Sequence, residues 1–86
     1  ATSGAAVSRL MFELLIEAYR FGVEIDNNTV LIKVRQTALA DRSGLARETV
    51  SRELHKLEQQ DLIGLSGQRI TIDTKKLEQK LGLNHL

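Results

Sequence analysis

The sequence predicts a small α+β fold that is mostly helical and carries one β-hairpin. Three observations lead to this prediction. The chain has 86 residues, which is enough for one compact core and too few for two. Apolar residues recur at helical spacing over much of the chain. Near its end, two stretches that predict short strands, residues 62–65 and 68–72, flank the pair Ser66-Gly67, which suits a two-residue hairpin turn. We therefore expect residues 1–86 to form a single domain.

The first expected helix spans residues 8–21 and follows a tail of small residues. Its main apolar stripe is broad, and a second stripe of Phe12, Ile16 and Tyr19 lies beside it. The remaining polar strip consists of Arg9, Glu13, Glu17 and Arg20. Two interpretations stay open. The helix is the centre of the core, or its second stripe meets a domain or subunit outside this chain.

A helix–turn–helix is expected in the middle of the chain. Residues 23–29 are polar and predict a loop, and the β-branched run 30–34 predicts a short strand. Residues 35–60 then predict two helices, separated by the tight turn Ser43-Gly44-Leu45. Two helices joined by a short turn that contains glycine are typical of this motif.

A wing and a last helix complete the expected domain. Residues 61–72 predict a hairpin, and residues 74–82 predict a short helix that Asp73 or Thr74 can cap. A helix–turn–helix followed by a hairpin is a winged helix–turn–helix, and this is the architecture that we expect.

The composition argues against several classes of function. The chain has no cysteine and two histidines, which excludes thiol chemistry and predicts no metal site. No glycine-rich loop follows a strand and no nucleophile stands beside a base, so we expect no catalytic residues and no enzyme. The absence of disulfides makes a reducing cytoplasm the expected location. No apolar run approaches the ~20 residues of a membrane span, so we expect no membrane partner. The net charge of +1 neither requires nor forbids nucleic acid.

The stretch from Arg35 to Arg52 resembles the helix–turn–helix of the Crp/Fnr family of bacterial transcription regulators. Its most specific part is residues 47–52, Arg-Glu-Thr-Val-Ser-Arg, which match the Arg-Glu-Thr-Val-x-Arg signature of the family. The similarity covers residues 7–80. One departure is Ala46, because the family commonly has a serine there that caps the recognition helix and touches a phosphate.

The resemblance implies a sequence-specific double-stranded DNA-binding domain. Family members are homodimers that bind pseudo-palindromic operators and recruit or block RNA polymerase. They carry an N-terminal effector domain and a long dimerisation helix, which by implication lie outside this chain. We therefore expect no cofactor in this domain, RNA polymerase as a partner, and a monomer when the domain is isolated.

The resemblance assigns base reading to Arg47, Glu48 and Arg52. An arginine fork fits the O6 and N7 atoms of guanine, and a carboxylate accepts from the amino group of cytosine. The ordinary alternative is that Glu48 and Arg52, four residues apart on a helix, form a surface pair worth about 0.3–0.5 kcal/mol. Both interpretations, base reading and a surface pair, hold if Glu48 orients Arg52.

A second set of residues is expected to contact DNA phosphates, from the first helix of the pair, the reading face and the wing tip. It consists of Arg35, Gln36, Thr37, Thr49, Ser51, Gly67 and Arg69. Such contacts position a protein without reading sequence. The alternative for each is plain capping or solvation. The alternative for the whole chain is a winged-helix protein–protein interaction module without DNA binding, which the near-neutral charge favours.

Overall fold

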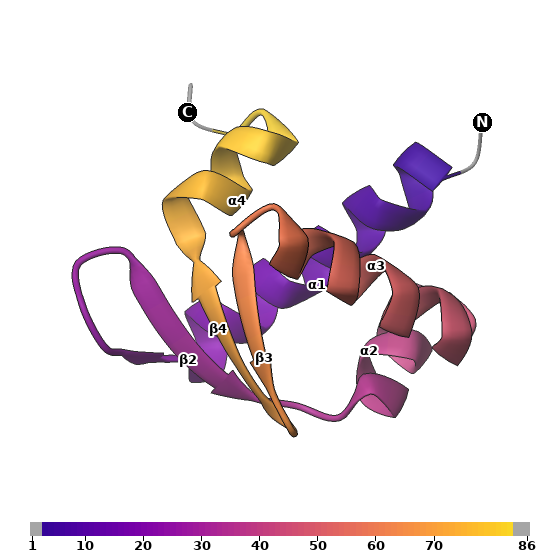
Figure 1. The fold of residues 1–86 in the computed structure, drawn as a ribbon, viewed down its shortest axis with the longest axis horizontal. Helices are drawn as coiled ribbons and strands as arrows, with labels where there is room; N and C mark the ends of the chain where they lie inside the picture. Colours follow the sequence, from indigo (N-terminus) through magenta and orange to yellow (C-terminus); the bar gives the residue numbers. More distant parts are fainter. Residues whose placement is uncertain (1–2, 84–86) are drawn as a thin grey trace.

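The computed structural model describes residues 3–83, which fold into four helices and a four-stranded antiparallel sheet. The elements in order are α1 (Ser3–Phe21), β1 (Val23–Glu24), β2 (Thr29–Lys33), α2 (Gln36–Ser43), α3 (Arg47–Gln59), β3 (Ile63–Ser66), β4 (Arg69–Asp73) and α4 (Thr74–Leu81). Helix α1 crosses the molecule diagonally, with the sheet packed on one half of it and α2 and α3 on the other (Figure 1). The predicted fold class, a winged helix–turn–helix of α+β type, is confirmed.

Helix α1 begins earlier than the sequence predicts. It starts at Ser3 instead of residue 8, because Ala5 and Ala6 are strong helix formers that extend it. The first two residues of the expected tail lie outside the described part of the chain. The main apolar stripe of α1 forms the centre of the core, and its buried members are Leu10, Met11, Leu14, Leu15 and Ala18.

The second apolar stripe of α1 stays on the surface. Phe12 and Ile16 are 44% and 43% exposed, and Tyr19 is 61% exposed. The helix is therefore central to the core through its first stripe only. Glu17, expected on the polar strip, is instead buried at 7% exposure and pairs with Arg42 of α2. This ion pair joins α1 to the helix–turn–helix.

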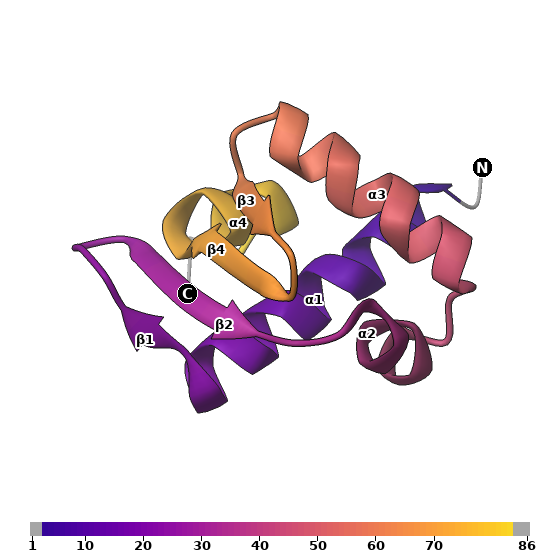
Figure 2. The ribbon, with the colours of Figure 1, turned by 60° about the horizontal axis from the view of Figure 1, so that its bottom comes forward.

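The sheet has the order β1-β2-β4-β3. Strand β1 corrects the sequence prediction of a loop at this place, because Val23 pairs with Leu31 and Glu24 with Val30. The turn that follows is the expected one: the Asp26 carboxylate accepts hydrogen bonds from the backbone N–H groups of Asn28 and Thr29. The turn thus folds β1 back onto β2 (Figure 2).

The turn of the helix–turn–helix lies where the sequence predicts it. Gly44 has a φ of 75° and its N–H donates to the carbonyl of Ala40, a left-handed conformation that glycine adopts at little cost. Helix α3 then packs Val50, Leu54 and Leu57 into the core. Its opposite side consequently faces solvent.

The wing is the hairpin of β3 and β4, and its turn lies one residue later than expected. Ser66 pairs with Arg69, so the turn is Gly67-Gln68, with a φ of 61° at Gly67. The backbone N–H of Val34 donates to the carbonyl of Gln68 at 3.0 Å. This bond fixes the wing tip beside the segment that enters α2.

Candidate nucleic-acid interface

Three segments that are distant in the sequence meet around one hollow: the start of α2, the first turn of α3 and the wing tip. The hollow has a volume of about 280 Å³. It is lined by Val34, Arg35, Gln36, Thr37, Arg47, Leu65, Gly67, Gln68 and Ile70. A neighbouring hollow of about 470 Å³ shares Gln36 and Arg47 and is completed by Glu48 and Ser51. The two hollows adjoin at Gln36 and Arg47, and we call their combined lining the α2–α3–wing face.

Both helices of the motif start on this face without a side-chain cap. The N-cap positions are Arg35 for α2 and Ala46 for α3, and neither side chain accepts a helix N–H. In α4, by contrast, the Asp73 carboxylate accepts from the backbone N–H of Lys76 at 3.0 Å. Free N–H groups and the positive end of the helix dipole make a helix start attractive to anions. The uncapped ends therefore suit phosphate oxygens.

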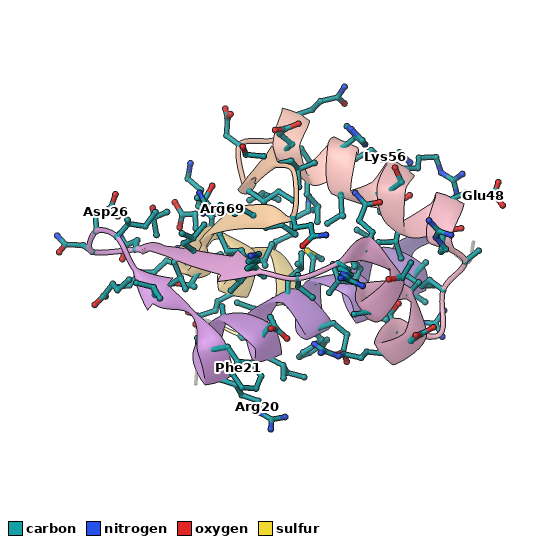
Figure 3. The ribbon with its side chains drawn as sticks, turned by 90° about the horizontal axis from the view of Figure 1, so that it is seen from below. Arg20, Phe21, Asp26, Glu48, Lys56 and Arg69 are labelled. Carbon is teal, nitrogen blue, oxygen red and sulfur yellow. The ribbon has the colours of Figure 1, made fainter. Side chains whose placement is uncertain are left out.

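Helix α3 separates its side chains by face. Arg47, Glu48 and Arg52 are exposed, and Thr49 and Ser51 are half-buried. Figure 3 shows Glu48 and Lys56 spaced along the outer side of α3, while Phe21 lies at the end of α1 on a different side of the molecule. The predicted base readers are therefore accessible to a large ligand.

The structure brings most of the predicted site residues together. Arg35, Gln36, Thr37, Arg47, Glu48, Ser51 and Gly67 line the α2–α3–wing face. Arg52, Thr49 and Arg69 line neither hollow. Arg69 is exposed and pairs across the strands with Lys33 of β2. Directly paired residues project to the same side of a sheet, so two cations lie together at the base of the wing tip.

The ordinary alternative for Glu48 and Arg52, a surface ion pair between them, does not form among the described residues. Within the described residues, the ion pair of Arg52 is with Glu53: Arg52 Nε lies 3.8 Å from Glu53 Oε2. The same oxygen lies 3.2 Å from Nζ of Lys56. The acid within ion-pair distance of Arg52 is therefore the next residue along the chain, not the residue four positions earlier.

Glu53 was not predicted from the sequence, although the chain carries a signal for it. Glu53 falls three residues after Val50 and four before Leu57, on the apolar stripe of α3. A carboxylate at such a position is buried and requires a cation. Gln68 was likewise not predicted as a contact residue, although it belongs to the turn of the hairpin and lines the hollow.

Two other features, a metal site and a membrane-spanning helix, were considered for the described residues. Among residues 3–83, no three histidine or acidic side chains are grouped as metal ligands would be. No helix in that part of the chain has the length and apolar character needed to cross a membrane.

Comparison with known proteins identifies the domain. Residues 6–80 match the Crp-like helix-turn-helix domain family. The chain is 30% identical to the catabolite activator protein of Thermus thermophilus, with a TM-score of 0.77 over 95% of this chain and 37% of that one. It is 26% identical to TTHB099, a CRP-family transcriptional regulator of Thermus thermophilus, with a TM-score of 0.76 over 90% of this chain and 40% of that one.

A search of curated proteins gives no match. The chain spans about two fifths of the length of the solved regulators that it resembles. The family match nevertheless covers nearly all of the described residues, and the winged helix–turn–helix with its α2–α3–wing face agrees with it. The chain therefore belongs to the Crp-like helix–turn–helix family of DNA-binding domains of transcription regulators.

Proposed function

We propose that this domain binds double-stranded DNA in a sequence-specific manner, with α3 in the major groove of one half of a pseudo-palindromic operator. The observation that carries the proposal is the α2–α3–wing face, where the first turn of α3 meets the start of α2 and the wing tip. A recognition helix reads base edges with its N-terminal residues while the neighbouring helix start approaches the backbone. The face offers both at once.

Base reading is the role that we propose for Arg47, Glu48 and Arg52. All three are exposed: Glu48 and Arg52 lie on the side of α3 that faces away from the core, and Arg47 lies in its first turn. Arginine suits guanine, and glutamate suits the amino group of cytosine. Because guanine and cytosine form one base pair, we expect operators that contain G·C pairs at the positions that these three side chains reach.

Phosphate contact is the role that we propose for the remaining predicted set: Arg35, Gln36, Thr37, Thr49, Ser51, Gly67 and Arg69. The uncapped starts of α2 and α3 support it at two points. The cations Arg69 and Lys33, paired across β2 and β4, support it at the wing. These contacts would fix the orientation of α3 without reading bases.

The wider function follows from the kind of protein that the chain resembles. TTHB099 is a transcriptional regulator more than twice as long as this chain. We propose that this domain acts in the cytoplasm as the non-catalytic DNA-binding part of a homodimeric regulator. Its effector would bind a different domain, so this domain needs no cofactor of its own, and bound dimers would act on RNA polymerase.

The proposal is tested by selecting bound sequences from a random duplex library and titrating the affinity with salt. We expect enrichment of a sequence with G·C pairs, and an affinity that falls steeply as salt rises because phosphate contacts release counterions. The rival function, a protein–protein module, predicts no duplex affinity at any salt concentration. An affinity without any enriched sequence would leave only non-specific binding and contradict the base-reading part.

A further inference from the structure

Glu53, the acid within ion-pair distance of Arg52, is unusual because it is buried. Glu53 is 5% exposed and belongs to the stripe of α3 that packs on the core. Its carboxylate oxygen Oε2 lies 3.2 Å from Nζ of Lys56 and 3.8 Å from Nε of Arg52. The side chains of these two cations are 53% and 59% exposed. Glu53 is therefore a buried anion approached from the outer side of α3.

A carboxylate in this position costs folding free energy that leucine or valine would not. Loss of water around an ionised group is unfavourable, and an ion pair offsets that loss only in part. The partners of Glu53 are anchored on the same helix and do not connect it to another element. The contact thus contributes little to the fold beyond α3.

The contact of Glu53 with Arg52 involves Nε and not the terminal NH₂ groups of the guanidinium. Glu53 approaches Nε, the atom nearest the stem of the guanidinium. The Arg52 side chain is 59% exposed, and its two terminal NH₂ groups form the fork that can donate to guanine O6 and N7. A side chain that is already ordered loses less conformational entropy on binding than a mobile one.

We propose that Glu53 is a positioning residue that orients Arg52 and thereby sets the base preference at the position that Arg52 reads. This inference rests on the proposed function. Glu53 also adds a negative charge beside the DNA-facing cations, which weakens the sequence-independent attraction to phosphates. Both effects raise the ratio of specific to non-specific binding.

The test compares Glu53→Gln with the unchanged protein on operator duplexes in which each G·C pair is replaced in turn. The amide keeps the size of the side chain and removes its charge. We expect discrimination at the pair read by Arg52 to fall by about 3- to 10-fold. At the other pairs it should stay the same, and the affinity for non-specific duplex should rise. A purely structural role would lower both affinities together, and unchanged discrimination would overturn the proposal.

Three further variants separate an effect of Glu53 on Arg52 from general effects of charge and of stability. Glu24→Gln removes the same charge from exposed β1, away from α3, and should leave discrimination unchanged. Glu53→Leu completes the apolar stripe of α3 and should fold at least as stably as the unchanged protein, yet lose the same discrimination. In an Arg52→Ala background, Glu53→Gln should have no further effect on discrimination, because the side chain that it positions is gone.

A measurement without DNA keeps the inference separate from the proposed function. Nitrogen NMR relaxation of Arg52 Nε should report a more restricted side chain in the unchanged protein than in Glu53→Gln. Equal mobility in the two proteins would overturn the contact itself. If the unchanged protein enriches no duplex, the base-reading role falls with the proposed function, while restricted motion still assigns the positioning of Arg52 to Glu53.

Discussion

At the scale of single residues, Ala46 leaves the recognition helix without a side-chain cap. It is the N-cap of α3, with φ −67° and ψ 150°, and it accepts no helix N–H through its side chain. We expect Ala46→Ser to stabilise the domain by about 0.5–1.5 kcal/mol, because a serine hydroxyl accepts from one of the free N–H groups. Urea unfolding measures the change. An unchanged midpoint would show that the new hydroxyl does not reach the helix start.

The same substitution also has a consequence for DNA binding. Ala46 is exposed directly before Arg47, which lines both hollows of the α2–α3–wing face. A hydroxyl there adds one donor for a phosphate, so we expect duplex affinity to rise similarly for all sequences. A gain restricted to one sequence would contradict a phosphate contact.

The arginines of the site are expected to divide into two classes. Arg47→Ala and Arg52→Ala should each cost about 1–3 kcal/mol on the selected operator and relax the preference at one position per half-site. Arg35→Ala should weaken all duplexes alike, because Arg35 lies at the start of α2, where phosphates are expected. Affinities on matched and mismatched duplexes measure both. A uniform loss for all three variants would contradict the division.

Residue types on the reading face could be predicted from the sequence, whereas their partners could not. The Arg-Glu-Thr-Val-x-Arg signature identified Arg47, Glu48 and Arg52, and the structure exposes all three. Helical spacing alone favoured a pair between Glu48 and Arg52. The acid actually close to Arg52 is Glu53, which is buried on the core stripe of α3 and also contacts Lys56. Which acid lies close to Arg52 depends on tertiary packing, and the spacing of residues along one helix does not predict tertiary packing.

At the scale of elements, local signals predicted best where they were strong. Gly44 and Asp73 placed the turn and the last helix correctly, because a left-handed glycine and a carboxylate cap act within a few residues. Strand β1 was missed because it has only two residues and depends on pairing with β2. The start of α1 was missed because small residues were interpreted as a tail, although alanine favours helix.

The attachment of the wing to α3 gives a prediction at this scale. Strand β3 is the edge of the sheet, and the backbone N–H of Leu65 donates to the Glu58 carboxylate of α3 at 3.0 Å. We expect Glu58→Leu to destabilise the domain by about 1–3 kcal/mol, because it leaves this N–H without its acceptor. It should also weaken duplex binding through a misplaced wing tip.

Glu58→Gln is the matched control for this prediction. Its side-chain carbonyl still accepts from Leu65, so most of the stability and affinity should remain. Amide hydrogen exchange at Leu65 reads the contact directly and should be faster in Glu58→Leu than in Glu58→Gln. Equal exchange in both variants would show that Glu58 does not hold the wing.

At the scale of the whole molecule, two surfaces of different character lie apart. The α2–α3–wing face carries seven of the ten predicted DNA contacts. The outer side of α1 and the adjoining β1 expose large apolar side chains: Phe12, Ile16, Tyr19, Phe21, Val23 and Ile25. Figure 3 places Phe21 and Glu48 on separate parts of the molecule. Occupation of one surface therefore leaves the other accessible.

The proposed function gives a prediction about operator affinity, because we propose that one α2–α3–wing face binds one half-site. Two recognition helices must lie about 34 Å apart, one turn of DNA, to read both halves. We expect the 86-residue chain to be a monomer that binds a full palindrome and a single half-site with similar, weak affinity. A parallel coiled coil fused ahead of α1 should raise affinity for the full palindrome by about 10²–10⁴-fold, through the effective concentration of the second domain.

Analytical ultracentrifugation and operator titration check this together, with two control duplexes. On a duplex with one half-site the fused and unfused chains should bind alike. Moving the half-sites apart by about half a helical turn should remove the gain, because the second α3 then faces the wrong side of the DNA. A stable dimer of the unfused chain that binds the full palindrome at nanomolar concentration would contradict the prediction. The dimer contact would then lie within these residues, and Phe12→Lys or Tyr19→Lys on the apolar side of α1 should break it.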